Sequence, residues 1–234
     1  MTAQRSRVWL FDLDNTLHDA THSAYADIND GMSSFIEQTL KLTRPEADTL
    51  RRRYWLRYGA TLLGLVRHHG VDAHHFLRHA HALPGLESRV RGHAGDLAAL
   101  ERLPGRKFIL TNAPAHYTER VLGVLGIAHL FDGVLAVEDM RMFGHWRPKP
   151  DARMLRRVAV QLRVHPSQCV LVEDTLMHQK SARSLGMRTV WMQRWLRRGG
   201  SAQPHGGVPP WTIRPAYVDL RVLRLLDLVR RPLR

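Results

Sequence analysis

The apolar positions of the chain follow two different patterns. Residues 6–11 form a short run that is almost continuously apolar, which is typical of a strand buried on both faces. Between residues 20 and 81, apolar side chains instead recur at helical spacing, as at Ile28, Met32 and Ile36. We interpret this second segment as a bundle of about four short helices.

After residue 84 the pattern changes to alternating helices and strands. Short apolar runs predict strands over residues 107–110, 133–137, 169–172 and 188–192. Helical segments are predicted over residues 97–103, 117–125, 151–162 and 179–185. This alternation predicts a parallel sheet with right-handed crossovers. The Gly- and Pro-rich segment 197–210 is predicted to be a loop, followed by a last short strand and helix.

Length and composition limit the architecture. A chain of 234 residues fits one domain with a large insertion, and its 44% apolar content is enough for a packed core. We expect a sheet-bearing core over residues 1–17 and 94–234, interrupted by a helical insertion over residues 18–93. What residues 197–234 contribute does not follow from the sequence.

The sequence contains no signal for a membrane or for export. No stretch approaches the roughly 20 uninterrupted apolar residues of a membrane span, and the first apolar run is too short for a secretory signal. Cys169 is the only cysteine, so no internal disulfide is expected, and its apolar neighbours are typical of the core. These features favour a cytoplasmic protein.

The chain is strongly basic, with 35 Lys and Arg against 21 Asp and Glu and a formal net charge of +14. One interpretation is nucleic-acid binding, with Arg51–Arg53 beside Tyr54 and Trp55 as a contact. Because the other charges are scattered, we favour solvated helix faces in an arginine-rich sequence. In either case the positive field attracts anionic substrates.

Polar side chains directly follow three of the predicted strands. They are Asp12 and Asp14 after the first strand, Thr111 and Asn112 after the second, and Glu173 and Asp174 after the fourth. Lys149 lies in the loop that follows the third strand. Because the ligand site of an open parallel sheet lies beyond the carboxyl ends of its strands, we expect these residues to converge.

These residue types suit a metal-bound phosphate. Carboxylate oxygens are hard ligands for Mg²⁺, and a divalent cation would remove the repulsion between Asp12 and Asp14. The Thr111 hydroxyl, the Asn112 backbone N–H and the compact charge of Lys149 suit phosphate oxygens. An aspartate can attack phosphorus, and a second carboxyl group can protonate the leaving alkoxide and then activate water.

Four ordered motifs resemble those of the haloacid dehalogenase superfamily of phosphatases. They are Asp12-Leu13-Asp14-Asn15-Thr16, Leu110-Thr111-Asn112, Lys149-Pro150 and Glu173-Asp174-Thr175. The resemblance implies a doubly wound, Rossmann-like α/β core with an inserted, all-helical cap that excludes water and selects the substrate. It further implies Asp12 as nucleophile, Asp14 as general acid/base, and Thr111 and Lys149 as phosphoryl ligands.

The same resemblance implies a Mg²⁺ ion held by side-chain oxygens of Asp12 and Asp174 and by the backbone carbonyl of Asp14. Glu173 is either a further, water-mediated metal contact or only a charged neighbour. One position departs from the superfamily, which usually has Asp or Asn four residues after Asp174, where this chain has His178. The outer-shell role of that position is therefore open.

The residues that would line the substrate cleft are less clearly marked. The candidates are His18, Asp19, Arg57 and Tyr58. His75 and His79, four residues apart, are an alternative zinc pair, but neither a cysteine nor a carboxylate completes such a site. Partly exposed helix histidines are the simpler interpretation.

The first motif, Thr111-Asn112 and the stretch Tyr58–Leu62 look most like the pyrimidine 5′-nucleotidase subgroup. We therefore expect Mg²⁺-dependent hydrolysis of a small phosphorylated metabolite, a nucleoside 5′-monophosphate. A sugar phosphate or phosphoglycolate is the alternative substrate, and a phosphomutase is an alternative activity. A nucleic-acid-binding or regulatory protein on the same fold is the alternative of another class. A dehalogenase is disfavoured, because it has no leaving alkoxide for Asp14 to protonate.

Overall fold

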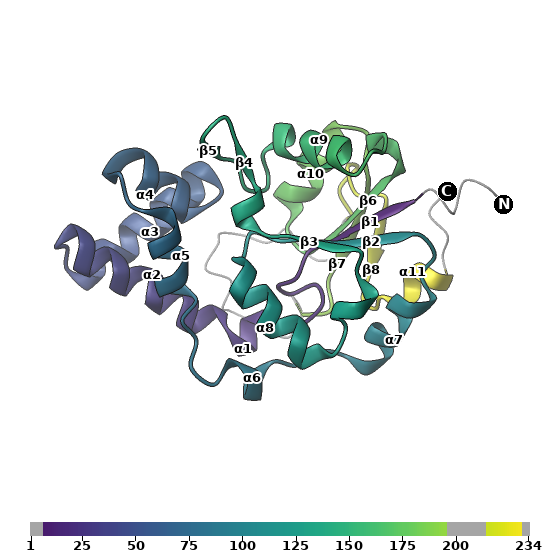
Figure 1. Cartoon of the computed structure of the whole chain (residues 1–234), viewed down its shortest axis with the longest axis horizontal. Helices are drawn as coiled ribbons and strands as arrows, with labels where there is room; N and C mark the ends of the chain where they lie inside the picture. Colours follow the sequence, from purple (N-terminus) through teal and green to yellow (C-terminus); the bar gives the residue numbers. More distant parts are fainter. Residues whose placement is uncertain (1–6, 196–213, 231–234) are drawn as a thin grey trace.

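The computed structural model describes residues 7–195 and 214–230 (Figure 1). Its centre is a six-stranded parallel sheet in the spatial order β3-β2-β1-β6-β7-β8. The strands are β1 (Val8–Phe11), β2 (Arg106–Leu110), β3 (Gly133–Leu135), β6 (Cys169–Glu173), β7 (Arg188–Met192) and β8 (Leu220–Val222). The chain winds outwards from β1 in both directions, which confirms the expected doubly wound sheet. The predicted loop over residues 197–210 lies outside the described residues. A final short strand was expected at Tyr217 and Val218, but β8 begins at Leu220.

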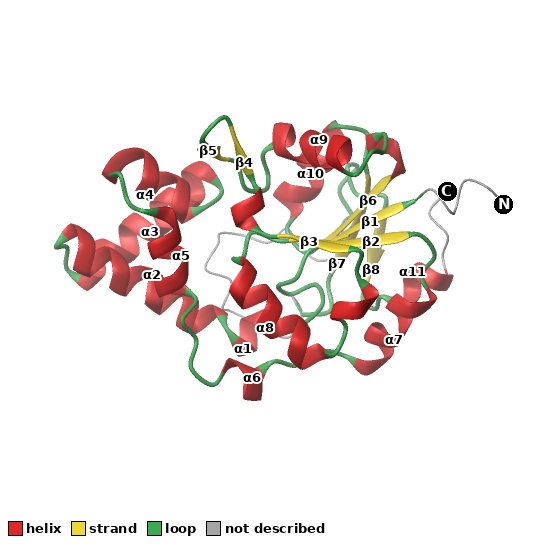
Figure 2. Ribbon diagram, viewed as in Figure 1, coloured by secondary structure: helices red, strands yellow, loops and turns green. Residues whose placement is uncertain are grey.

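Helices cover both faces of the sheet (Figure 2). The side chains of β1 alternate, so that Trp9 and Phe11 pack on one face and Val8 and Leu10 on the other. The first face carries α7 (Ala94–Arg102), α8 (Ala115–Leu125) and α11 (Leu226–Arg230), and the second carries α9 (Ala152–Gln161) and α10 (Leu176–Ser184). Burial on both faces explains why the first apolar run is continuous.

The helical insertion lies between β1 and β2. It comprises α1 (Ala20–Ser23), α2 (Tyr25–Leu40), α3 (Arg44–Tyr58), α4 (Thr61–His69), α5 (Ala73–Ala80) and α6 (Leu86–Arg89). Helices α2 to α5 form a bundle with its own apolar core, seen beside the sheet in Figure 1. The ends of the insertion pack elsewhere, because Ala24, Leu86 and Val90 belong to the cluster beneath α8. The insertion is therefore anchored to the sheet-bearing part at both ends.

Local sequence signals account for the tight packing of α3. Thr43 and Glu46 form a capping box at its start, and Pro45 lies in the first turn. Gly59 ends the helix with φ +80°, a left-handed conformation that glycine adopts without strain. On α4, a Cβ atom at Gly64 would lie 2.1 Å from the Tyr54 ring, so glycine is required for the contact between α3 and α4.

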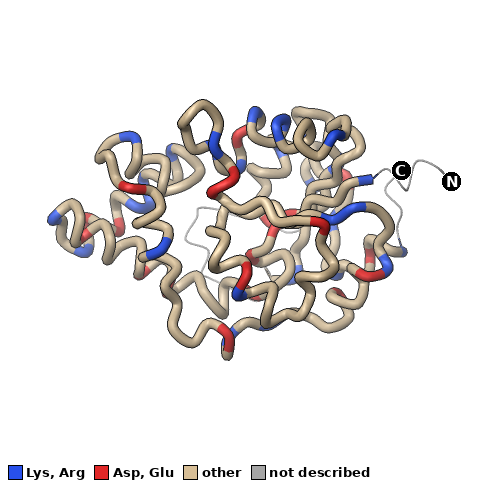
Figure 3. The backbone as a smooth tube through the Cα atoms, viewed as in Figure 1, with Lys and Arg blue, Asp and Glu red and all other residues tan. Residues whose placement is uncertain are grey.

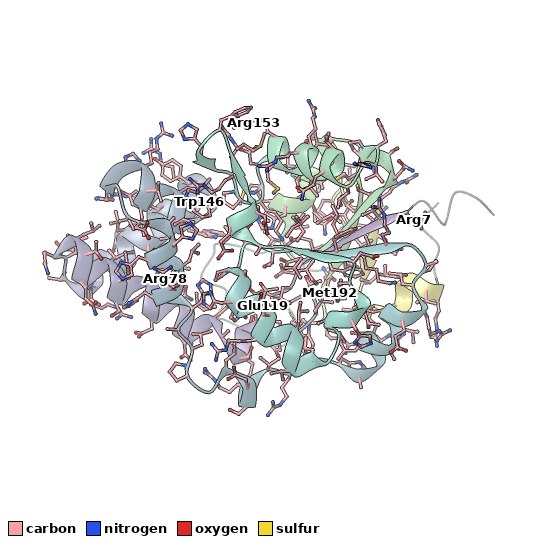
Figure 4. All side chains as sticks on the ribbon, in the orientation of Figure 1. Arg7, Arg78, Glu119, Trp146, Arg153 and Met192 are labelled. Atoms are coloured by element: carbon pink, nitrogen blue, oxygen red, sulfur yellow. The ribbon has the colours of Figure 1, made fainter. Side chains whose placement is uncertain are left out.

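A short antiparallel hairpin, not predicted from the sequence, joins the two parts of the molecule. It consists of β4 (Arg141–Met142) and β5 (His145–Trp146), and its turn residues Phe143 and Gly144 both have positive φ. Trp146, labelled in Figure 4, packs edge-on against His74 of the insertion, with ring centroids 5.4 Å apart.

The predicted strand over residues 133–137 is too long by two residues. The strand ends at Leu135, and Val137–Asp139 form a 3₁₀ turn. The physical reason is that the N–H of Val137 donates to the carbonyl of Ala113, and its side chain packs into the core of the helical insertion. The chain thus leaves the sheet before the apolar run ends.

Charged residues are spread over the described part of the backbone (Figure 3), with acidic residues between the basic ones. Several arginines are paired, for example Arg120 with Glu87 at 2.6 Å and Arg89 with Asp27 at 2.6 Å. This distribution is that of solvated faces. Within the described ranges, no helix is both long enough and apolar enough to cross a membrane.

Candidate active site

The first motif forms a tight turn at the end of β1. The N–H of Asp12 continues the ladder by donating to the carbonyl of Val172 at 2.9 Å, and Leu17 N–H donates back to Leu13 at 2.9 Å. Asn15 has φ +55°, and its side-chain oxygen accepts a hydrogen bond from Thr21 N–H at 3.0 Å. These hydrogen bonds fix Asp12 just beyond the carboxyl end of β1 and connect the turn to α1.

A buried lysine joins residues from three separate parts of the chain. Lys149 Nζ lies 2.7 Å from Asp12 Oδ1 and 2.7 Å from Glu173 Oε2, and the lysine side chain is only 1% exposed. Burial alone would lower the pKa of Lys149, but the two adjacent carboxylates outweigh it and raise that pKa above its usual range. The lysine is therefore a fixed positive charge in the site.

The carboxyl groups outnumber this single lysine. Asp12, Glu173 and Asp174 each have an oxygen within 4.8 Å of the others. Burial and the negative charge of Glu173 raise the pKa of Asp12 to about 8, and burial with the same neighbour raises that of Asp174 well above normal. Without a cation the two aspartates therefore ionise with difficulty, because Lys149 can balance only one of the three carboxylates. An oxygen cluster of this kind fits a divalent cation such as Mg²⁺, which would favour the ionised forms.

Each carboxylate oxygen of Glu173 lies beside a side-chain nitrogen. Oε2 accepts from Lys149, and Oε1 lies 3.1 Å from His178 Nδ1. Despite its burial, the pKa of Glu173 is held below its usual range by Lys149 and His178. Gln179 fixes the strand end by donating to the Glu173 carbonyl at 2.8 Å. His178, which stands where the superfamily usually has Asp or Asn, therefore contacts the carboxylate of Glu173.

Thr111 and Asn112 lie at the end of β2 and line the same cavity. The Thr111 hydroxyl accepts from Ala113 N–H at 3.0 Å. The Asn112 side chain bonds twice to the backbone of Lys149, donating to its carbonyl and accepting from its N–H, both at 2.9 Å. From the sequence we expected only the backbone N–H of Asn112 to act, as a phosphate ligand. In the structure its side-chain amide holds the loop that carries Lys149 in place.

Asp14 lies beside Asp12 but has different partners. Its Oδ1 accepts from Tyr117 Oη at 2.7 Å and lies 2.9 Å from His18 Nε2. Burial and the Asp14 charge raise the pKa of Tyr117 well above its usual value, so the phenol stays protonated. Tyr117 was not predicted as a site residue, because its place on α8 resembles that of any core aromatic.

These groups line one side of a cavity of about 230 Å³, and the helical insertion lines the other. The residues from the insertion include Ile28, Asn29, Met32, Arg51, Trp55 and Phe76. Arg51 is 11% exposed, donates to Asn29 Oδ1 at 2.6 Å and to Ser33 Oγ at 3.0 Å, and has its pKa lowered by burial. The cavity is therefore lined by a second, largely buried cation from α3, whose guanidinium group also lies 3.7 Å from Asp48 Oδ1.

The four residues suggested for the cleft are placed differently. His18 is fully buried beneath Asp14, Asp19 caps α1 by accepting from His22 N–H, and Tyr58 and Arg57 lie outside the lining of this cavity. Helical phase explains the correction for Arg57. Arg51 and Trp55 both line the cavity and are four positions apart, so they lie on the same face of α3. Arg57 is six positions from Arg51, about 240° around the helix, and therefore lies on another face.

The suggested zinc pair also has a simpler explanation. His75 and His79 both pack edge-on against Phe35, with ring centroids 5.2 Å and 5.5 Å from it. Within the described part of the chain, the one group of three potential metal ligands is the acidic cluster at Asp12. The two histidines therefore belong to the packing of the helical bundle.

The fold is a doubly wound α/β core with a buried carboxylate–lysine centre, and comparison with known proteins specifies its family. The family model for the haloacid dehalogenase-like hydrolases matches residues 7–186 of the sequence. The crystal structure of a HAD phosphatase from Thermococcus onnurineus superposes with a TM-score of 0.61 over 96% of both chains, at 18% identity. The chain therefore belongs to the haloacid dehalogenase-like hydrolases.

Two curated relatives extend this comparison. Phosphate metabolism protein 8 of Saccharomyces cerevisiae is 24% identical over 197 residues, which cover 77% of this chain and 60% of that protein. The phosphoglycolate phosphatase of Colwellia psychrerythraea is 25% identical over 226 residues, covering 90% of this chain and 94% of that enzyme. The chain thus spans about 60% of the length of the yeast protein and nearly all of the bacterial enzyme.

Proposed function

We propose that the protein hydrolyses small phosphate monoesters through a phosphorylated aspartate. The observation that carries this proposal is the convergence of Asp12, Lys149 and Asp174 on one buried cavity from separate loops. A nucleophilic carboxylate, a fixed cation and a metal-binding oxygen cluster are the components that phosphoryl transfer requires. The match to phosphatases of this family supports the same reaction.

In the first step a carboxylate oxygen of Asp12 attacks phosphorus, and the bond between phosphorus and the ester oxygen breaks. Lys149 and Thr111 hold the phosphoryl oxygens during this transfer. Asp14 donates its proton to the departing alkoxide, so that an alcohol leaves. In the second step Asp14 takes a proton from water, whose oxygen attacks phosphorus and releases inorganic phosphate and free Asp12.

Mg²⁺ would be held by side-chain oxygens of Asp12 and Asp174 and by the backbone carbonyl of Asp14. When bound, it neutralises charge on the transferring phosphoryl group. We assign Glu173 to holding Lys149, whose ammonium group lies 2.7 Å from its Oε2.

The substrate class follows from the helical insertion, residues 18–93, which we propose acts as a cap. A cavity of about 230 Å³ suits a small metabolite rather than a macromolecule. Trp55 and Met32 offer apolar surface to a ring, and Arg51 and Asn29 offer polar groups to oxygens. A nucleoside 5′-monophosphate of the pyrimidine type fits this lining.

Phosphoglycolate or a sugar phosphate is the second candidate, because one relative, which matches 90% of this chain, is a phosphoglycolate phosphatase. A screen distinguishes these two substrate classes. Purified protein is assayed with nucleoside monophosphates, sugar phosphates and phosphoglycolate, with and without Mg²⁺. We expect Mg²⁺-dependent release of phosphate that is lost in Asp12→Asn. Full activity of that variant would contradict the proposal, and salt-sensitive retention on heparin without any turnover would favour a nucleic-acid-binding protein.

A further inference from the structure

Two buried side chains converge on a single oxygen of Asp14. Tyr117 Oη donates to Asp14 Oδ1 at 2.7 Å, and His18 Nε2 lies 2.9 Å from the same atom. Tyr117 and His18 are both 0% exposed, whereas the Asp14 side chain is 16% exposed and lines the cavity. The carboxyl group is therefore held from inside the protein and faces the cavity with its other side.

The two oxygens of Asp14 are consequently not equivalent. Among the described residues, no hydrogen bond or ion pair of the protein ends on Oδ2. A carboxyl group bonded through one oxygen loses its freedom to rotate, and its other oxygen is left for a proton transfer. Proton transfer needs the acid within about 2.6–3.2 Å of the departing oxygen, so fixing this group matters for the rate.

The holding residues are themselves held. His18 Nδ1 lies 3.4 Å from Ser23 Oγ, and the ring of His81 packs edge-on against Tyr117 with centroids 5.5 Å apart. The backbone of His18 bridges both to Asp14 and to Gly92, where the chain leaves and re-enters the sheet-bearing part. Tyr117 comes from α8, which lies about a hundred residues further along the chain than Asp14. Two independent elements thus fix one side chain.

We propose that Tyr117 and His18 are positioning residues that hold Asp14 so that Oδ2 meets the oxygen of the leaving group. This inference rests on the proposed function, because it assigns these residues to the step in which the alkoxide is protonated. It predicts that their loss matters most when the leaving group is a strong base. An alkyl phosphate needs that proton, whereas p-nitrophenyl phosphate releases a stable anion without it.

The test compares Tyr117→Phe and His18→Asn with the unaltered protein in the presence of Mg²⁺. Rapid-quench measurements of alcohol release in the first turnover isolate the step from the later hydrolysis. We expect the first-turnover rate for an alkyl phosphate, such as glycerol phosphate, to fall by about tenfold to 10²-fold, the range caused by misplacing a catalytic group. For p-nitrophenyl phosphate the rate should change less than about threefold, since little proton transfer is needed.

Tyr54→Phe is the matched control, because it removes a hydroxyl 2.7 Å from His69 Nε2 in a residue that does not line the cavity. It should leave both rates unchanged. Equal losses for the two substrates in both variants would overturn the inference, as would a rise in KM with no change in the first-turnover rate. If Tyr117→Phe unfolds, His18→Asn alone decides. Absence of turnover in the unaltered protein would instead contradict the proposed function.

Discussion

Lys149 Nζ and Asp12 Oδ1 lie 2.7 Å apart although 137 positions separate the two residues in the chain. Both are buried, and Glu173 accepts a second bond from the same ammonium group. The contact joins the loop after β5 to the end of β1, the central strand. It makes Lys149 part of the stability of the core as well as of the proposed chemistry.

Replacing Lys149 by Met should therefore destabilise the protein in the absence of divalent cations. The change leaves Asp12 and Glu173 buried without their partner, which typically costs about 3–5 kcal/mol. Urea unfolding in EDTA measures the free energy of unfolding. Lys180→Met, at an exposed lysine of α10, is the control and should change it by less than about 0.5 kcal/mol. A similar small effect at Lys149 would show that the buried pair is not needed.

Mg²⁺ should raise the thermal unfolding midpoint of the protein. A cation that binds only the folded state stabilises it by about 2.7 kcal/mol at a concentration of 100 Kd. Asp174→Asn should abolish the shift, because it removes an oxygen of the acidic cluster, whereas Glu119→Gln, at an exposed carboxylate, should retain it. A shift that persists in Asp174→Asn would place the cation elsewhere.

Arg51→Gln should raise KM for substrates whose far end carries acceptor oxygens, such as a pyrimidine nucleotide. A charge-assisted hydrogen bond contributes about 1.5–3 kcal/mol, which corresponds to at least about a tenfold change in binding. Phenyl phosphate, which lacks such oxygens, should bind as before. Steady-state kinetics of Arg51→Gln and of Arg52→Gln, an exposed neighbour, make the comparison. Unchanged KM values in both variants would remove Arg51 from substrate recognition.

His81 should make the protein less stable as the pH falls. Burial lowers its pKa from 6.5 to about 4, against the opposing effects of its bond to the Leu77 carbonyl and of Asp14, and together with a smaller effect of His116. The unfolded chain therefore binds more protons between pH 6.5 and 4, so this contribution is present above pH 6.5 and lost towards pH 4.

The full effect is about 3 kcal/mol, from about 1.4 kcal/mol per unit of pKa, and about 2 kcal/mol of it falls between pH 7.5 and pH 5. Urea unfolding at pH 7.5 and pH 5 should show a weaker pH dependence for His81→Gln than for the unaltered protein. His129→Gln, at an exposed histidine, should keep the original dependence. Identical pH dependence in all three proteins would contradict the assignment of a neutral His81.

Much of the sheet was predictable because each strand carries its own local pattern. Val8 to Phe11 are continuously apolar since both faces of β1 are covered, and the polar residues that follow must emerge at one edge. The partners of those residues were harder to predict. Tyr117 and Arg51 act through helical phase and through the packing of α8 and α3, which residue type alone does not reveal.

The remaining misses have the same origin. The hairpin at Arg141–Trp146 has strands of two residues, too short for a periodic pattern to indicate them. Asn112 was expected to act through its backbone, but its side chain matches the N–H and carbonyl of Lys149, a contact between segments that only the folded chain brings together. Long-range contacts, rather than local propensity, decide these features.

The most direct test of the central claim is to trap the phosphorylated enzyme. A substrate carrying ³²P in its phosphoryl group is mixed with the protein and Mg²⁺, quenched in acid within the first turnover, and the labelled peptide is identified. We predict an alkali-labile label on the peptide that contains Asp12, and none in Asp12→Asn. Rapid phosphate release without any label on the protein, or a label on another residue, would contradict nucleophilic attack by Asp12.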